Sequence, residues 1–178
     1  MIHKILEEIN SAKDTFGAMC KKYTGSLTVE IIKNALSLSL PLNKIEISPR
    51  DVFIRGVPSE IDFLIAKKGA IAQNYLLYEP SDILWVFEIK NSGSFSKETI
   101  STIRNKFQKI SNYNREIECF YLTLNELIKY KWAITEENLA FPSFTLFWHS
   151  MSGKNKKFEP TNDWEKLIEK ITKRLENI

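Results

Sequence analysis

Glu88, Ile89 and Lys90 close the most hydrophobic run of the sequence, and their types and spacing could do chemistry. Residues two apart on a strand point to the same side, so Glu88 and Lys90 are expected to share one face. Asp62 lies 26 residues earlier, inside another apolar stretch, and would face them if the two strands are neighbours in register. Burying a carboxylate is costly unless a cation, a metal or a hydrogen bond satisfies it. The pattern therefore predicts a divalent-metal site held by Asp62 and Glu88, with Lys90 beside it.

The context of the Glu88-x-Lys90 triplet carries more weight than the triplet. The chain has 22 acids and 20 lysines, so chance alone would supply about two or three acid-x-lysine triplets. This triplet occurs once, ends a strand expected to be covered on both faces, and precedes a Ser-rich turn and a basic helix. Those features favour a functional site over a coincidence.

The elements that must position these residues follow from apolar periodicity. The first helix should stop at Gly25, and Pro41 bars continuation of the second. The prediction in chain order is helices 2–22 and 26–38, strands 44–48, 51–55, 60–66 and 83–90, a helix 96–113, strands 118–124 and 143–148, and a closing helix 162–175. The strands 51–55 and 60–66 should form an antiparallel hairpin, and the segment from Ile83 to Leu124 a strand-helix-strand crossover.

These elements predict an α/β fold with a mixed central β-sheet flanked by helices. The 178 residues are 43% apolar, enough for one domain with a sizeable core. We expect a single domain over 1–178, with N-terminal helices in 1–40, the core with Asp62 and the Glu88-x-Lys90 triplet in 43–124, and a C-terminal strand and helix in 125–178.

The order of elements and the acids within them resemble the restriction-endonuclease-like superfamily, known by its PD-(D/E)XK signature. Asp62 matches the first acid and Glu88-Ile89-Lys90 the second half, although Ile61 stands where the named pattern has proline. The resemblance implies that Asp62 and Glu88 bind Mg²⁺, or Mn²⁺ in its place, and that Ile89 lends its main-chain carbonyl. It also implies that Lys90 positions or activates the attacking water. The implied reaction is hydrolysis of a phosphodiester in nucleic acid, leaving a 3′-hydroxyl and a 5′-phosphate.

Further residues on the helices are candidates for accessory roles. Many members of the superfamily place a glutamate on the helix before the sheet, and Glu30 fits that place. Some add a glutamine on the helix after the lysine, a place that Gln108 fills. Basic residues of that helix could contact backbone phosphates or could simply form a solvated face. The nucleic-acid-binding residues that we expect are Lys97, Arg104, Gln108 and Lys109, and Lys106 and Arg115 are further basic residues of the same region.

Several other kinds of site are excluded by missing residues. His3 and His149 are the only histidines, and no HExxH or HxH pair exists to hold zinc. The two cysteines lack CxxC spacing. With six glycines and no phosphate-cradling loop, an enzyme acting on free nucleotides is disfavoured. We therefore expect His149 to be structural.

Two other interpretations of the same residues stay open. Asp62, Glu88 and Lys90 could form a buried ion-pair network without a catalytic role. Alternatively, the chain could be a catalytically silent nuclease-like module that binds nucleic acid or a partner protein. A lack of metal binding would favour the silent module.

Charge and hydropathy bear on partners and location. The net charge of +3 permits nucleic acid as a partner without demanding it. We expect DNA as the substrate and restriction or defence as the biological role. The first residues include acids where a signal peptide needs an apolar run, and no stretch approaches 18 apolar residues. We therefore expect a cytoplasmic protein without membrane contact. Because restriction-like nucleases often cut both strands as dimers, a homodimer is compatible with this interpretation.

Overall fold

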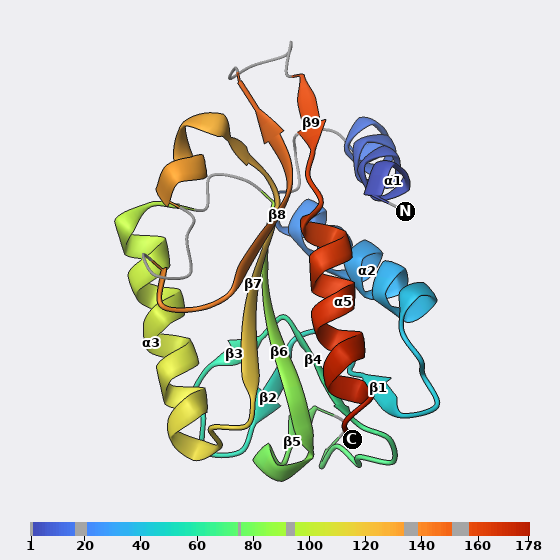
Figure 1. The fold of residues 1–178 in the computed structure, drawn as a ribbon, viewed down its shortest axis with the longest axis vertical. Helices are drawn as coiled ribbons and strands as arrows, with labels where there is room; N and C mark the ends of the chain where they lie inside the picture. The colour runs from blue at the N-terminus through green and yellow to red at the C-terminus, as the bar shows by residue number, and fades with distance from the viewer. Residues whose placement is uncertain (1, 17–20, 75, 92–94, 134–138, 151–156) are drawn as a thin grey trace.

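A six-stranded mixed sheet forms the centre of the molecule (Figure 1). The computed structural model describes residues 2–16, 21–74, 76–91, 95–133, 139–150 and 157–178. The strand order is β1 (Ile45–Ile47), β4 (Phe63–Lys67), β6 (Ile83–Lys90), β7 (Glu118–Leu127), β8 (Ser143–His149) and β9 (Phe158–Pro160). The strands β6, β7 and β8 are parallel neighbours, whereas β4 is antiparallel to β1 and β6, and β9 is antiparallel to β8. The predicted mixed α/β sheet is confirmed.

Helices cover both faces of this sheet. The helices α1 (Ile2–Phe16), α2 (Lys21–Ser39) and α5 (Asp163–Leu175) pack on one face, and α3 (Lys97–Tyr113) packs on the other. A small second sheet shares the α3 side, in the order β3 (Glu60–Ile61), β2 (Val52–Ile54) and β5 (Leu77–Tyr78). Two 3-10 turns, Pro80–Asp82 and Ile128–Ala133, complete the connections. The described residues therefore form two hydrophobic cores, one on each side of the main sheet.

The helix α3 connects β6 to β7, as the predicted crossover requires. It begins after Ser96, whose Oγ accepts a hydrogen bond from the main-chain N–H of Thr99 at 3.1 Å, a typical N-cap. Its buried residues are Ile103, Phe107 and Ile110. Burial of this stripe fixes the rotation of α3 about its axis, and thereby determines which flank of the helix faces the end of β6.

Aromatic side chains hold the strands of the main sheet in register. Phe63 of β4 stacks on Phe87 of β6 with ring centroids 4.5 Å apart, and Phe87 meets Phe120 of β7 edge-on at 5.5 Å. All three are fully buried. Because a slip of one residue would turn these rings to the other face, their packing fixes Glu88, the residue after Phe87, on the α3 side.

The predicted break at Gly25 is wrong. The helix α2 spans Lys21–Ser39, and Gly25 lies inside it, while α1 ends at Phe16. A glycine inside a helix costs about 1 kcal/mol relative to alanine, but Val29, Ile32 and Leu36 continue the buried face of α2. Tertiary burial therefore outweighs the local preference of the glycine.

Several strands differ from the predicted ones. The stretch 60–66 is divided at Asp62, so that β3 pairs with β2 in the small sheet and β4 joins the main sheet. The hairpin is thus correct for β2 and β3, which pair through Val52 and Ile61, but not for the rest of the second strand. The strands β5 and β9 were not predicted, and β7 continues to Leu127. No helix in the described ranges is long and apolar enough to cross a membrane.

Candidate functional site

Asp62 lies where the chain passes from the small sheet to the main sheet. The register of β4 against β6 pairs Phe63 with Phe87, which brings Asp62 opposite Glu88. The Oδ2 atom of Asp62 accepts a hydrogen bond from the main-chain N–H of Ile89 at 2.5 Å. The structure therefore joins the two acids that the sequence places 26 residues apart, although Asp62 stands at a break between strands rather than at the centre of one.

Glu88 is a buried carboxylate held by two lysines. Its side chain is 8% exposed, and its two neighbours on β6, Phe87 and Ile89, are also buried. Lys90 donates from Nζ to Oε1 at 2.7 Å, and Lys106 of α3 donates from Nζ to Oε2 at 2.7 Å. Lys106 also donates to the main-chain carbonyl of Glu60 at 2.9 Å. Each oxygen of Glu88 is thus paired with a separate cation, and Lys106 ties α3 to the small sheet.

The charges of the site perturb one another. Burial and the neighbouring Glu88 carboxylate raise the pKa of Asp62 to about 6, against the opposing effect of the Ile89 N–H and the two lysines. Burial by itself would lower the pKa of Lys90, but the Glu88 and Asp62 carboxylates outweigh it and raise that pKa. Lys90 is therefore a cation at neutral pH, suited to orient a water or stabilise developing negative charge rather than to accept a proton.

The oxygen donors here fit a magnesium ion. Carboxylate and carbonyl oxygens are the ligands that Mg²⁺ prefers, and one or two protein carboxylates suffice when water and substrate phosphate complete the coordination. Within the described ranges, no group of three or more His, Cys, Asp or Glu side chains could hold a metal. The pair Asp62 and Glu88, with the adjacent carbonyl of Ile89, matches an open magnesium site rather than a closed protein cage. A metal there would compete with the lysines for Glu88.

Glu30 lies on α2, which packs on the opposite face of the sheet from α3. Its carboxylate pairs with Lys33 at 3.2 Å, one turn along the same helix. Among the contacts of the described residues, none joins Glu30 to Asp62 or Glu88. The contacts of Glu30 among the described residues therefore keep it on α2 and do not join it to the two acids.

The expected nucleic-acid-binding residues are all exposed on α3, but they do not share one flank. Lys106 projects from one side of the buried stripe toward Glu88. Arg104 and Gln108 lie on the other side and line a cavity of about 480 Å³. Lys97 lies in the first turn, and Lys109 is exposed in the second half of the helix. The role of Lys106 in the site was missed from the sequence, where it counted as one more basic residue of the helix.

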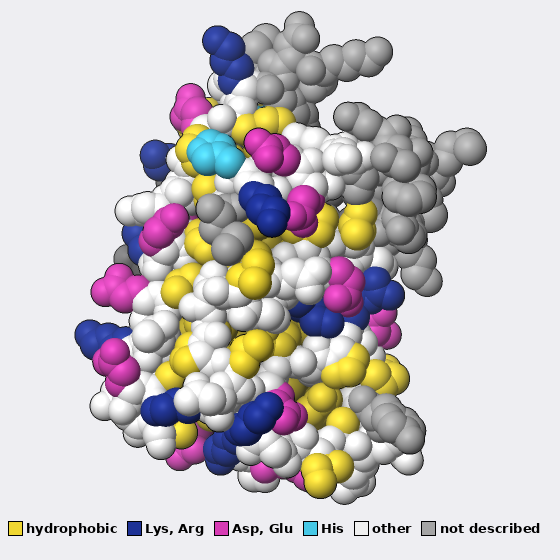
Figure 2. Space-filling view, turned by 90° about the vertical axis from the view of Figure 1, so that its right-hand side faces the viewer, with side chains coloured by type: hydrophobic (Ala, Val, Ile, Leu, Met, Phe, Trp, Pro, Cys, Tyr) yellow, Lys and Arg dark blue, Asp and Glu magenta, His cyan; other side chains and the backbone are white. Residues whose placement is uncertain are grey.

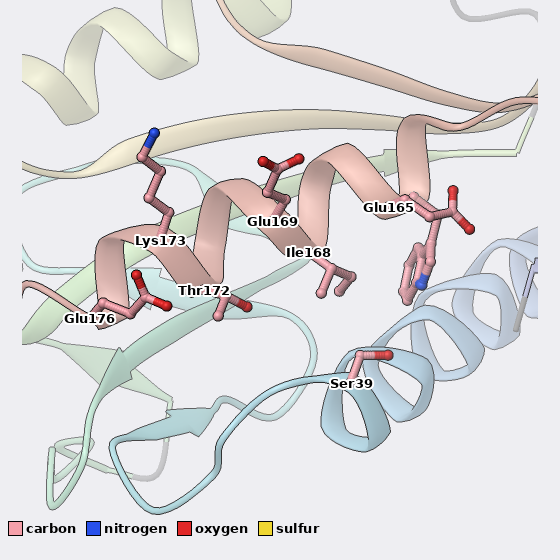
Figure 3. A pocket seen from close by; sticks show the side chains of 8 residues that line it. Ser39, Glu165, Ile168, Glu169, Thr172, Lys173 and Glu176 are labelled. Atoms are coloured by element: carbon pink, nitrogen blue, oxygen red, sulfur yellow. The ribbon is translucent and has the colours of Figure 1, made fainter.

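The other cavities and the opposite face show different chemistry. A cavity of about 670 Å³ lies between the end of α2 and α5, and its charged lining residues are Glu165, Glu169, Glu176 and Lys173 (Figure 3). Figure 2 shows that the face over α2 and α5 carries acidic and basic side chains interspersed. His149 is buried beside Phe158, with ring centroids 5.9 Å apart. None of these features lies at Asp62 or Glu88.

Comparison with known proteins identifies the fold through structure rather than sequence. No protein-family model and no curated protein matches the sequence. The chain is similar to NucC from P. aeruginosa ATCC27853 in its cAAA-bound form, with a TM-score of 0.67, 12% identity, and coverage of 96% of this chain and 87% of that one. It is equally similar to cAAA-bound NucC from E. coli MS115-1, with a TM-score of 0.67, 13% identity, and coverage of 96% and 86%.

The apo form of the E. coli NucC gives a TM-score of 0.55 at 12% identity, covering 96% of this chain and 90% of that one. These likenesses extend over nearly the whole chain, so they concern the complete arrangement of sheet and helices. The fold is the restriction-endonuclease-like fold. The resemblance drawn from Asp62 and the Glu88-Ile89-Lys90 triplet is therefore confirmed at the level of the fold.

Proposed function

We propose that the chain is a metal-dependent nuclease that hydrolyses phosphodiester bonds in nucleic acid, with DNA as its substrate and restriction or defence as its setting. The observation that carries the proposal is that Asp62, which accepts a hydrogen bond from the Ile89 N–H, lies beside Glu88, whose two carboxylate oxygens accept hydrogen bonds from Lys90 and Lys106. The restriction-endonuclease-like fold supports it, because nucleases use this fold, and Asp62 with Glu88-Ile89-Lys90 resembles the acids and lysine of the superfamily's signature.

The metal would be held by Asp62, Glu88 and the main-chain carbonyl of Ile89. Bound there, Mg²⁺ or Mn²⁺ would neutralise charge on the scissile phosphate and lower the pKa of a water ligand. For this, Asp62 must lose its proton, which its raised pKa of about 6 allows at neutral pH. Asp62 would thus carry the negative charge that a metal ligand needs at neutral pH.

The two lysines have distinct tasks in the proposal. Lys90, charged and 39% exposed along its side chain, would orient the attacking water and stabilise the charge that develops on the phosphate. Lys106 is 16% exposed and holds Glu88 from the side of α3, so it positions that carboxylate. In the reaction, the water oxygen bonds to phosphorus and the bond from phosphorus to the 3′ oxygen breaks. A 5′-phosphate and a 3′-hydroxyl result.

The substrate would extend beyond the scissile phosphate. Lys97 and Lys109 are exposed on α3 and are proposed to contact backbone phosphates, a mode of binding that carries no sequence information and weakens with salt. Cutting both strands of a duplex calls for two sites, so the proposal includes a homodimer.

The test is cleavage of a mixed panel: methylated and unmethylated duplex DNA, single-stranded DNA, and RNA, each with Mg²⁺, with Mn²⁺ and with EDTA. The variants are Asp62→Asn, Glu88→Gln and Lys90→Met, with Glu98→Gln as a matched control because Glu98 is an exposed acid of α3 outside the site. Half of the reactions contain cAAA, the ligand named for two of the neighbouring structures.

The expected result is metal-dependent cutting that EDTA and each site substitution reduce at least a hundredfold, with the control unchanged. Cutting that survives Glu88→Gln would overturn the assignment of the site. A folded protein that binds nucleic acid but cleaves none of the substrates under any condition would refute the nuclease proposal and favour the catalytically silent binding module. Circular dichroism of each variant shows that the comparison is between folded proteins.

A further inference from the structure

A second cavity lies along α3 on the flank away from Glu88. It has a volume of about 480 Å³, within the range of small-molecule sites. Its walls come from three places: the second half of α3, the start of β7, and the turn that enters β8. The residues that line it are Arg104, Phe107, Gln108, Ser111, Asn112, Arg115, Cys119, Ala140, Phe141 and Pro142.

The charge of this cavity has one sign. The charged side chains among its described lining are Arg104 and Arg115, whereas the cavity by α5 is lined by three glutamates and one lysine. Arg104 donates from Nε to the main-chain carbonyl of Leu139 at 3.3 Å, which anchors its guanidinium at the rim. Arg115 has no acidic partner among the described residues. Two guanidinium groups without a lining acid favour an anion, and their planar donors suit phosphate oxygens.

The floor of the cavity is aromatic and uncharged. Phe107 and Phe141 meet edge-on with ring centroids 5.2 Å apart, and Tyr121 packs against Phe141 at 5.9 Å. Burial raises the pKa of the Cys119 thiol to about 12, so the thiol stays neutral and acts as an apolar surface. A floor of this kind suits a flat ring rather than a simple inorganic ion.

Neutral polar groups lie between the floor and the arginines. Gln108, Ser111 and Asn112 each supply both donors and acceptors. Gln108 and Ser111 follow Arg104 at steps of four and three residues, which places them in one stripe along α3, and Arg115 lies just past the end of the helix. The cavity therefore combines an apolar floor, hydrogen-bonding walls and a cationic rim.

We infer that this cavity binds a nucleotide unit, with its base over Phe107 and Phe141 and its phosphate on Arg104 and Arg115. The unit could be a free nucleotide or one residue of a nucleic-acid strand, since both present the same ring and phosphate. The site is separate from the proposed cleavage site, because Lys106, on the opposite flank of α3, makes the contact with Glu88. The inference thus reaches beyond the proposed function and does not rest on cleavage.

The test measures binding by titration calorimetry to the Glu88→Gln protein, so that no probe is cut. The probes are the four ribonucleoside 5′-monophosphates, the matching nucleosides, inorganic phosphate, and a 5′-phosphorylated trinucleotide of each base. The variant pair is Arg104→Gln with Arg115→Gln, and Lys173→Gln is the control, because Lys173 is an exposed cation of α5, outside the cavity lining and on the other face of the sheet.

We expect at least one monophosphate or trinucleotide to bind more tightly than its nucleoside and than inorganic phosphate. The double substitution should raise its Kd at least tenfold, and Lys173→Gln should leave the Kd within twofold. Preference for the trinucleotide would assign the unit to a strand, and equal binding would assign it to a free nucleotide. Failure of every probe to bind at millimolar concentration, or equal losses in the double variant and the control, would overturn the inference. Neither result bears on whether Glu88 supports cleavage.

Discussion

Replacing Asp62 by asparagine should make the protein more stable while removing its proposed activity. The Asp62 carboxylate is ionised at neutral pH beside Glu88 in a partly buried place, and burial together with that neighbour raises its pKa from 3.8 to about 6. Asparagine keeps an oxygen that can accept the hydrogen bond from the Ile89 N–H, which Asp62 now accepts at 2.5 Å. The substitution therefore removes a disfavoured charge and keeps the contact.

The size and sign of the effect follow from the pKa. A rise from 3.8 to about 6 corresponds to about 3 kcal/mol at 1.36 kcal/mol per pKa unit. Below pH 4 the carboxyl is protonated in both states, and between pH 4 and 6 the folded state keeps a proton that the unfolded chain has lost. The wild-type free energy of unfolding therefore falls relative to the variant as the pH rises from 4 to 6. Above that window the difference stays constant, at up to about 3 kcal/mol.

Urea unfolding of the wild type and Asp62→Asn from pH 4 to 8, without metal, measures this difference. Asp82→Asn is the control, an aspartate of the Pro80–Asp82 turn, and should stay within about 0.5 kcal/mol of the wild type. Saturating Mg²⁺ at pH 8 should stabilise the wild type and not Asp62→Asn, because a ligand that binds the folded state raises its stability. Parallel pH curves for the wild type and Asp62→Asn, or an Asp62→Asn protein less stable at pH 8, would refute the reasoning.

Two further predictions concern the second lysine and the assembly. Lys106→Met removes one of the two cations on the buried Glu88 and should lower the free energy of unfolding by about 1–3 kcal/mol; the loss should shrink when Mg²⁺ supplies the charge. Urea titration with and without Mg²⁺ checks this against Lys109→Met, and equal losses in the two variants would contradict it. Light scattering should give twice the chain mass of 20.7 kDa, and a single-chain mass at every concentration would contradict the homodimer.

The acids of the site could be picked out from the sequence because charge is conspicuous in an apolar strand. Glu88 follows Phe87 at the end of a run whose residues are buried from Ile83 onward, and an ionised group there needs a partner. The partner on its own strand, Lys90, follows from the two-residue period. What the sequence could not supply was the second cation, because nothing local links Lys106 to Glu88 across 18 residues.

The phase of α3 could have separated the basic residues into two groups. Ile103, Phe107 and Ile110 mark the buried side, and at 100° per residue Lys106 falls on one flank of that stripe while Arg104 and Gln108 fall on the other. The sequence alone does not say which flank borders Glu88, since that depends on how α3 lies across the sheet. The contact of Lys106 with Glu60 and Glu88 decides it.

The short strands could not be predicted for a related reason. The strands β5 and β9 have two and three residues, too few for a period to show, and they exist because a longer neighbour offers a free edge. Phe158 pairs with His149 of β8, and Leu77 pairs with Phe53 of β2. The intrinsic strand propensity of these residues does not predict such short strands, because pairing with the neighbouring strand determines their backbone conformation.

The break at Asp62 explains how the site arises from the fold. Ile61 is buried in the core on the α3 side and Phe63 in the core on the other side, so the chain must leave one sheet and enter the other between them. The strand β4 begins at Phe63, opposite Phe87, and the N–H of Ile89 beyond it is met by the Asp62 carboxylate instead of a strand partner. The requirement to satisfy that N–H draws Asp62 toward Glu88. Two acids therefore meet at the place where the two cores adjoin, and the free energy that this crowding costs is what a bound divalent cation would recover.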